Sequence, residues 1–464
     1  MSGFLPGLVN SFRTSAWSIP GYRRLQSGNL FLNMGRFIER VAQSWLVFKL
    51  TGDPFWVGLH AFASDSPMLA AALPAGTLAD RFDRRRLLLT LAVLWAFSAF
   101  GLAGLSLAGL LTGRSGAVLI VSIGLFQGFC GAIARPVMSS SLQDVVGREH
   151  LSSALALNSA FFNVCRLVGP AVGGILLEHY DSATPAFLLN SLGFLIVLLA
   201  FSGVRLGKGA ASRNETFRKQ IGEALRHGFG HPGLRRLWLG TLSFCFLTGP
   251  IQGLLVVFVD QAFGGGARAY GNMLSAMAVG ALCGAVIAAK APARMPRHHL
   301  IPIAGFAYGI AGMLLSFTTA HHFGAALMVL VGVCHSTFLI SSMTAVQLLA
   351  PDAMRGRVVS VQMACFGGMP LGNMLAGLLA SQFGAPLTFF LYMAALALAG
   401  VFWVAHRIPA IDGDMETTPR AGFIEGLRAT RHRTATASRT LSEPIASIAP
   451  IPEPSRSTDG IARP

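Results

Sequence analysis

The sequence predicts an all-helical integral membrane protein with about twelve transmembrane helices. Hydrophobic residues make up 53% of the 464 residues and charged residues only 12%, which is about half the charged fraction of a soluble domain. The mean hydropathy is +0.58. The apolar residues recur as runs of about 20, the length that a helix needs to cross the hydrocarbon core. The bilayer is therefore the expected solvent of this chain.

The apolar runs form two sets of six. The first six spans are expected at 28–50, 54–79, 86–110, 115–138, 151–177 and 184–204. The second six are expected at 234–259, 269–289, 300–319, 323–349, 357–382 and 385–406. Pro and Gly inside several runs are compatible with membrane helices, because neighbouring helices can satisfy the backbone groups that they free.

The spans divide the chain into five parts. Residues 1–27 are polar and basic, without a cleavable signal peptide, and 28–204 form an N-terminal six-helix half. The central loop 205–233 contains an amphipathic stretch that we expect to lie along the membrane surface. Residues 234–406 form a C-terminal six-helix half. The tail 407–464 is rich in Ser, Thr, Pro, Ala and Arg, a composition typical of disorder.

The basic residues lie mainly in alternate loops. They are concentrated in four loops, which follow the second, sixth, eighth and tenth spans. The loops expected on the other side of the membrane carry only Lys49, Arg114 and Arg268. The positive-inside rule therefore predicts that both termini are cytoplasmic. The net charge of +16 does not indicate a nucleic-acid partner, because the charges sit in short loops and in the tail.

The two halves are related in sequence. The segment around Gln143 is echoed by the segment around Gln347, and Gly169 aligns with Gly372, at offsets of 204 and 203 residues. Two parallel six-helix repeats are a known transporter architecture, in which the substrate site lies near the midplane between the repeats.

Two motifs resemble a known family. The loop Gly76–Arg86, GTLADRFDRRR, is similar to the signature loop of the major facilitator superfamily, with Asp83 where the general motif has Gly. This variant resembles the branch of bacterial siderophore exporters of the enterobactin type. The stretch Cys165–Gly174, CRLVGPAVGG, is similar to the antiporter motif of the superfamily, with Cys165 in place of its first Gly.

The resemblance implies a major facilitator fold in the inner membrane of a bacterial cell. The gate-loop residues implied by the first motif are Gly76, Asp80, Arg81, Arg84 and Arg85. The antiporter-like residues implied by the second are Gly169, Pro170, Gly173 and Gly174. Positive-inside topology alone could account for Arg84 and Arg85. The fourth span departs from the family, since Gly124 stands where antiporters often carry an arginine.

The first span carries a polar stripe. Its members, spaced three and four residues apart on one helix face, are Asn29, Asn33, Arg36, Glu39, Arg40 and Gln43. Charges at bilayer depth are costly and mark functional sites by default. The stripe is therefore expected to face an aqueous cavity or a partner helix.

Two carboxylates are candidates for proton coupling. Glu39 lies 11 residues from Gly28 and 11 from Leu50, or about 16 Å from each end of the span. Asp65 lies near the middle of the second span. Arginines on the face of Glu39 would keep it ionised, so we favour Asp65 as the proton carrier, with Glu39 as part of an ion pair or a substrate clamp.

Further candidates for the substrate cavity are Gln127, Arg166 and His335, which join Asn33, Arg36, Arg40 and Gln43. Arginines at this depth suit an anionic substrate such as a catecholate or a carboxylate. Arg135 is better explained by snorkelling to the interface, and His335 could equally be a hydrogen-bonded packing residue.

The function that we predict is secondary active export of a small organic molecule, for which a siderophore is one candidate, by proton antiport with alternating access. An importer on the same fold and a non-transporting membrane sensor are the alternatives. The expected partners are the small-molecule substrate, protons and the lipid bilayer. The oligomeric state is open, and we take a monomer as the working expectation.

An enzyme is not expected. The sequence has no His-Glu-x-x-His, Gly-x-Ser-x-Gly or Walker A motif. The six cysteines all fall inside apolar spans without metal-ligand spacing, so we expect neither a metal site nor a cofactor.

Overall fold

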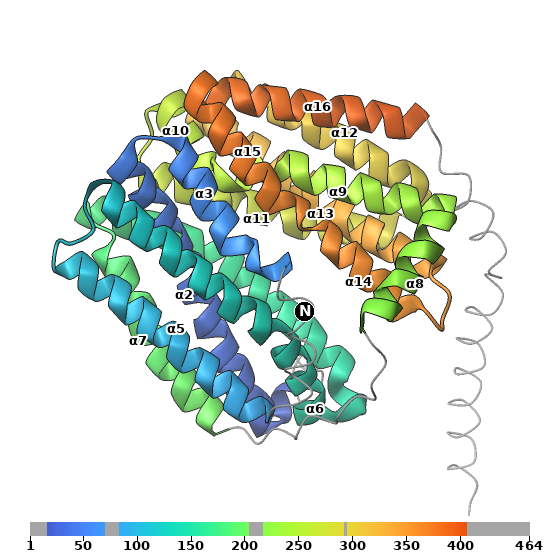
Figure 1. Cartoon of the computed structure of the whole chain (residues 1–464), viewed down its shortest axis with the longest axis horizontal. Coiled ribbons are helices and arrows are strands. Elements are labelled where there is room, and N and C mark those ends of the chain that lie inside the picture. The colour runs from blue at the N-terminus through green and yellow to red at the C-terminus, as the bar shows by residue number, and fades with distance from the viewer. Residues whose placement is uncertain (1–15, 70–82, 204–216, 292–294, 406–464) are drawn as a thin grey trace, which may run out of the picture. The chain divides into compact units, whose positions relative to one another are not determined.

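A computed structural model describes residues 16–69, 83–203, 217–291 and 295–405 of the chain (Figure 1). The regular elements in these ranges are helices, as the composition predicts. Nine of them are long and apolar enough to cross a membrane, and a bent pair makes ten. The polar helix α2 and the short helix α3 lie where the first two spans are predicted, and the second of these spans continues outside the described residues. The prediction of an all-helical membrane protein with about twelve membrane helices is confirmed.

The N-terminal half contains α2 (Pro20–Thr51), α3 (Pro54–Asp65), α5 (Arg84–Leu107), α6 (Gly113–Tyr180) and α7 (Thr184–Ser202). The long helix α6 is two spans joined end to end, because Gly147 has a φ of +69° and interrupts the helical backbone. The turn between α2 and α3 is built by Gly52 in the left-handed conformation and by Asp53, whose side chain accepts a hydrogen bond from the Phe55 N–H at 2.9 Å.

The short amphipathic helix α8 (Phe217–Gly230) lies in the central loop, where an amphipathic stretch is predicted. The helices of the C-terminal half are α9 (Pro232–Gly253), α10 (Leu255–Phe263), α11 (Ala267–Lys290), α12 (Arg297–Ser316), α13 (His321–Leu349), α14 (Arg355–Cys365), α15 (Gly368–Phe383) and α16 (Ala385–Ala405). The seventh span bends by 54° between α9 and α10. Pro250 lies one turn before the bend and removes a backbone donor from the helix.

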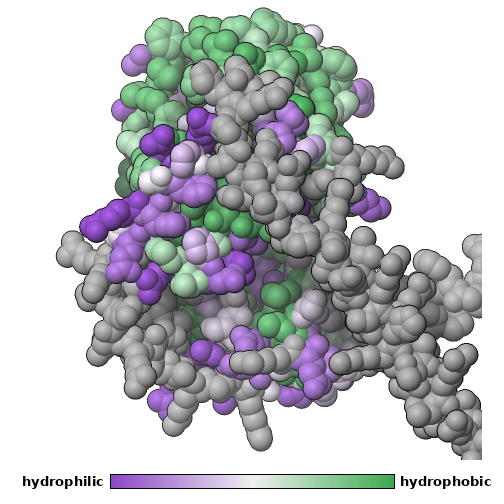
Figure 2. Space-filling model, turned by 90° about the vertical axis from the view of Figure 1, so that its right-hand side faces the viewer, coloured by the Kyte–Doolittle hydropathy of each residue, from purple (hydrophilic) through white to green (hydrophobic). Residues whose placement is uncertain are grey.

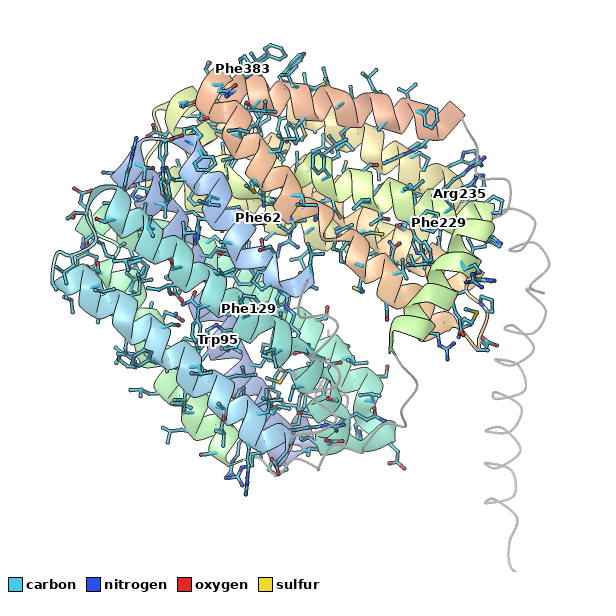
Figure 3. All side chains as sticks on the ribbon, in the orientation of Figure 1. Phe62, Trp95, Phe129, Phe229, Arg235 and Phe383 are labelled. Carbon is cyan, nitrogen blue, oxygen red and sulfur yellow. The ribbon has the colours of Figure 1, made fainter. Side chains whose placement is uncertain are left out.

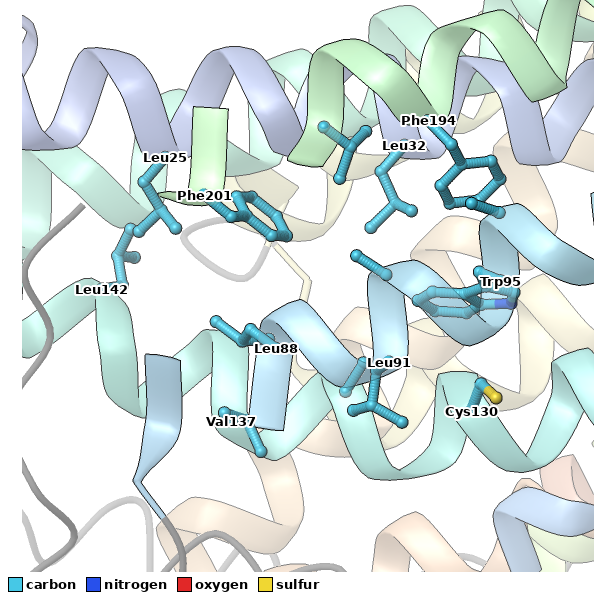
Figure 4. Packing of buried hydrophobic residues seen from close by; sticks show 14 of the residues in the cluster. Leu25, Leu32, Leu88, Leu91, Trp95, Cys130, Val137, Leu142, Phe194 and Phe201 are labelled. Carbon is cyan, nitrogen blue, oxygen red and sulfur yellow. The ribbon is translucent and has the colours of Figure 1, made fainter. Parts of the chain in front are cut away.

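The N-terminal half packs around a cluster of buried side chains from α2, α5, α6 and α7 (Figure 4). Trp95 of α5 is 3% exposed and packs against Phe194 of α7, with ring centroids 6.3 Å apart. Leu32 of α2 and Cys130 of α6 belong to the same cluster. Because lipid is as apolar as these side chains, close packing rather than exclusion from water is what stabilises such contacts.

The two halves contact each other through glycines near one end of the molecule. A Cβ added to Gly58 of α3 would lie 2.7 Å from the Gly377 Cα of α15. A Cβ added to Gly174 of α6 would lie 3.2 Å from the Gly271 Cα of α11. Backbone thus meets backbone at both crossings, which only glycine permits. We call these two contacts the glycine crossings.

The opposite end carries α8 and α14. Arg235 and Phe229 lie at this end, and Phe383 lies at the end near the glycine crossings (Figure 3). Arg357 of α14 bonds to Glu223 of α8, with the Nη1 and Oε2 atoms 2.8 Å apart. Hydrophilic residues gather at this end, while apolar residues cover the upper flank (Figure 2). We call the end that carries α8 and α14 the α8 end.

Candidate functional site

The centre of the N-terminal half holds a buried carboxylate in a cage of amides. Glu39 of α2 is only 4% exposed. Its Oε1 accepts hydrogen bonds from the Nε2 atoms of Gln43, at 3.0 Å, and Gln127 of α6, at 2.9 Å. Its Oε2 accepts a hydrogen bond from the Nδ2 of Asn190 on α7. Three neutral donors from three helices therefore satisfy this carboxylate.

The cage extends to a fourth helix and depends on one glycine. Gln127 Nε2 also donates to the Ser98 Oγ of α5 at 3.2 Å. One turn before Glu39, a Cβ on Gly35 would lie 2.0 Å from the Oδ1 of Asn190. Gly35 is thus required for α7 to approach α2 closely enough that Asn190 can reach Glu39.

The second carboxylate, Asp65, forms an ion pair with Arg40. The Arg40 Nη1 lies 3.2 Å from Asp65 Oδ1, and Nη2 bonds to Oδ2, so the guanidinium engages the carboxylate through two atoms. The two side chains are 43% and 26% exposed. Arg40 therefore bridges α2 and the end of α3, and the pair remains accessible from an adjacent cavity.

The arginines of the α2 stripe do not bond to Glu39. Arg40 bonds to Asp65, and the guanidinium carbon of Arg36 lies 5.2 Å from the ring centroid of Trp95. Neither arginine of the stripe therefore forms a direct ion pair with Glu39 in this structure. A long arginine side chain reaches across to a neighbouring helix as readily as along its own helix face.

A cavity of about 180 Å³ lies beside both carboxylates and is lined by the stripe residues Asn33, Arg36, Glu39, Arg40 and Gln43, and by Ser64, Asp65, Gly124, Gln127, Gly128, Arg135, Phe37 and Phe162. A larger cavity of about 320 Å³ shares its walls at Asn33, Arg36, Arg135 and Phe162 and reaches Leu25 and Leu142, towards the α8 end. A small cavity of about 90 Å³ shares Arg40 and Phe37 and reaches Arg166, Gln252 and Tyr270.

The three cavities together extend from the α8 end towards the glycine crossings. Tyr270 in the small cavity is adjacent in sequence to Gly271, and Pro170 in the same cavity lies one turn before Gly174. The halves are in backbone contact beyond this level. The glycine crossings therefore lie on the side of the cavities that faces away from the α8 end.

Most of the predicted cavity residues line these cavities. Asn33, Arg36, Arg40, Gln43 and Gln127 line the central one, and Arg166 lines the small one. His335 does not: it is 5% exposed and packs between Phe244 and Tyr308 within the C-terminal half.

The antiporter-like motif is a packing element in this structure. Gly169 faces Phe37 of α2, where a Cβ would lie 2.6 Å from the Phe37 Cβ. Gly173 lies against the Ile38 carbonyl, and Gly174 forms one of the glycine crossings. Pro170 lines the small cavity. The motif therefore brings α6 against both α2 and α11.

The gate-loop motif is described only in part. Gly76, Asp80 and Arg81 lie outside the described residues. Arg84, at the start of α5, forms an ion pair with Asp144 of α6, with Nη1 and Oδ2 2.6 Å apart. Arg85 donates a hydrogen bond to the carbonyl oxygen of Ser202 at the end of α7.

Sequence reasoning missed several polar residues of the site. Asn190 and Ser98 belong to the amide cage, and Arg135 lines both larger cavities instead of extending to the interface. Gln252 and Tyr270 line the small cavity. A lone polar residue inside an apolar span was the available signal for Asn190 and Arg135.

Comparison with known proteins identifies the family. Residues 14–432 match the model of the family described as transmembrane secretion effector. The multidrug efflux pump Tap of Mycolicibacterium fortuitum is 30% identical over 388 residues, covering 81% of this chain and 93% of the pump. The staphyloferrin A transporter of Staphylococcus aureus is 24% identical, covering 82% of this chain and 95% of the transporter.

Similarity also extends to the exporter branch that the signature loop indicates. The enterobactin exporter of Citrobacter koseri is 28% identical over 151 residues, covering 31% of this chain and 35% of that exporter. Among solved structures, a variant of the nucleoside transporter NupG has a TM-score of 0.71 at 12% identity, covering 82% of this chain and 99% of NupG, which shows the shared fold. The chain belongs to the transmembrane secretion effector family of the major facilitator superfamily.

Proposed function

We propose that this protein is a secondary active exporter that exchanges a small organic molecule for protons by alternating access. Its place is the inner membrane of a bacterial cell, with the α8 end and both termini on the cytoplasmic side. The two six-helix halves are the units that move against each other, and the structure described above is then the state open to the cytoplasm.

The amide cage around Glu39 is the observation that carries the proposal. A buried proton carrier must be satisfied both with and without its proton. Asn and Gln side chains can donate through their NH2 group or, after rotation, accept through their carbonyl oxygen. Gln43, Gln127 and Asn190 can therefore serve the ionised and the protonated carboxyl group alike.

Asp65 is less suited to carry the proton. Protonation of Asp65 would break its two-atom contact with Arg40 and leave a guanidinium without its partner in a membrane helix. These contacts support Glu39, whereas the sequence favoured Asp65. We assign the proton to Glu39, and to the Arg40–Asp65 pair a role in holding α2 and α3 together in this conformation.

Export as the direction is supported by the relatives. The multidrug efflux pump Tap covers most of this chain, and a shorter stretch matches an enterobactin exporter. A siderophore is the first candidate substrate, because the cavity walls carry the cations Arg36, Arg40, Arg135 and Arg166, and metal-free siderophores often carry carboxylate or catecholate oxygens.

The proposal can be tested by untargeted mass spectrometry of cells and growth medium, with and without iron. A strain that lacks the gene would be compared with strains complemented by the wild-type protein or by the variants Glu39→Gln and Asp65→Asn. The matched control is Glu149→Gln, which removes an exposed carboxylate at the α8 end. Immunoblots of membrane fractions show whether the variants are present in equal amounts.

A compound should accumulate inside the deletion strain and be released by the wild-type and Glu149→Gln proteins, but not by Glu39→Gln. Release only under iron limitation would identify a siderophore. Identical cell and medium contents in all strains would contradict export.

A further inference from the structure

Two arginines of the cavity wall form no ion pair with any residue that the structure describes. Arg36 of α2 and Arg135 of α6 both line the central cavity and the larger cavity beside it. Within the described ranges, neither guanidinium forms an ion pair, since the acidic groups of the central cavity bond to Arg40 and to the amide cage. Their cationic charges therefore face the same two cavities.

The positions of both guanidiniums are fixed by neutral neighbours. Arg36 lies over the ring of Trp95, and its Nη2 atom would be 3.5 Å from a Cβ on Gly131, one turn before Arg135. The Arg135 Nη1 bonds to the Sδ of Met68 at 3.2 Å, which is a weak acceptor. Neither neighbour carries a charge, and the nearby carboxylates Glu39 and Asp65 bond to other groups. An anion between the two arginines would therefore reduce their mutual repulsion.

The surroundings of the two arginines define the shape of the anion. A guanidinium presents a planar fork of donors that matches a carboxylate or another planar oxyanion through two hydrogen bonds. The aromatic ring of Phe162 lines both cavities, and the larger cavity also contains Trp95, Asn29 and Asn158. Aromatic walls of this kind bind a flat ring next to the oxyanion.

We infer that Arg36 and Arg135 form a binding subsite for a planar oxyanion carried on an aromatic ring, such as an aromatic carboxylate or a catecholate. The inference rests on the proposed function, because it assigns this group to the transported molecule. The substrate enters from the α8 end, and its oxyanion reaches the two arginines before it reaches Arg40 and the amide cage.

The subsite can be tested by equilibrium binding, without any measurement of transport. Salicylate and its neutral analogue salicylamide differ in the charge of one group on the same ring. Isothermal titration calorimetry would compare their binding to the purified full-length protein in detergent. The variants are Arg36→Gln, Arg135→Gln and Arg36→Lys, and the matched control is Arg114→Gln at the glycine-crossing end.

The wild-type protein should bind salicylate more tightly than salicylamide. Loss of one charge-assisted contact should weaken salicylate binding by about 10- to 100-fold in Arg36→Gln and in Arg135→Gln. Arg36→Lys keeps the charge but not the fork, so it should fall between wild type and Arg36→Gln. Binding of salicylamide should change in none of the variants, which shows that the cavity is intact, and Arg114→Gln should behave as wild type.

Equal affinity for the two probes, no salicylate binding by the wild-type protein, or unchanged salicylate binding in both glutamine variants would overturn the inference. Glu39→Gln separates it from the proposed function. This variant should retain salicylate binding while failing to export. If it exports normally, the assignment of the proton to Glu39 is wrong, whereas the anion subsite stands on its own binding data.

Discussion

The glycine crossings predict that one methyl group can change which end of the transporter is open. In Gly58→Ala, the added Cβ would lie 2.6 Å from the Asn373 carbonyl oxygen, 2.7 Å from the Gly377 Cα and 3.1 Å from the Gly377 N. All three atoms are backbone, so no side-chain rotation can relieve the overlap. The contact between α3 and α15 must therefore open by several tenths of an ångström or more.

The size of the effect follows from the cost of overpacking. An extra methyl group in a close-packed site costs about 1–3 kcal/mol. That cost applies only to the conformation in which the crossing is closed, because the proposed alternating-access cycle separates the halves there in the opposite state. The ratio of the two states should thus shift by about 5- to 150-fold towards the state that is open at the glycine-crossing end.

Distances between spin labels measure this shift directly. In a variant without the six native cysteines, Arg114→Cys and His322→Cys place labels on the two halves at the glycine-crossing end. Glu149→Cys and Asp352→Cys do the same at the α8 end. Double electron–electron resonance should show longer distances for the first pair and shorter distances for the second when Gly58→Ala is introduced.

The matched control is Gly193→Ala in α7, where an added Cβ meets no atom within 4 Å. Its label distances should equal those of the parent protein. If Gly58→Ala also leaves both distance distributions unchanged, the crossing does not set the conformational equilibrium, and the inference from backbone contact is refuted.

Two further predictions concern the charges of the cavity. The single variant Asp65→Asn should have a lower thermal unfolding midpoint than the double variant Arg40→Gln, Asp65→Asn, because only the single change leaves Arg40 without its partner. An equal or lower midpoint in the double variant would contradict this. The second prediction concerns the membrane potential. When a singly charged anion leaves the cell and a proton enters, the two movements together carry two positive charges inward. An inside-negative potential of 100 mV should therefore add about 4.6 kcal/mol to the driving force, or more than about 10³-fold in accumulation. The accumulation of the compound can be measured in proteoliposomes with a potassium diffusion potential. Transport that does not change with the potential would contradict exchange of a proton for an anion.

The fold could be predicted because the bilayer imposes one length on every span. Twelve apolar runs of about 20 residues leave little choice of architecture, and the shared register of Gln143 and Gln347 indicated the repeat. The break between α9 and α10 was not predicted, since 234–259 reads as one apolar run. Pro250 marks the place, but prolines also occur in the straight α12.

The candidate site could be predicted one helix at a time. The three- and four-residue spacing of the α2 stripe correctly placed Asn33, Arg36 and Gln43 on the cavity. It could not show which arginine bonds to which carboxylate, because the pairing depends on how neighbouring helices are rotated about their axes. Asn190 reaches Glu39 only because Gly35 lets α7 approach, and no spacing within either helix indicates that contact.

The central claim is that a proton bound at Glu39 is exchanged for the exported compound. It is tested most directly in proteoliposomes that contain the purified protein, a pH-sensitive dye and the compound that accumulates in the deletion strain. When the compound leaves the wild-type vesicles, the account predicts that protons enter in a fixed ratio to it. With Glu39→Gln, neither flux should occur, whereas Glu149→Gln should match the wild type. Release of the compound through Glu39→Gln at the wild-type rate, or release through the wild-type protein without proton entry, would contradict the account.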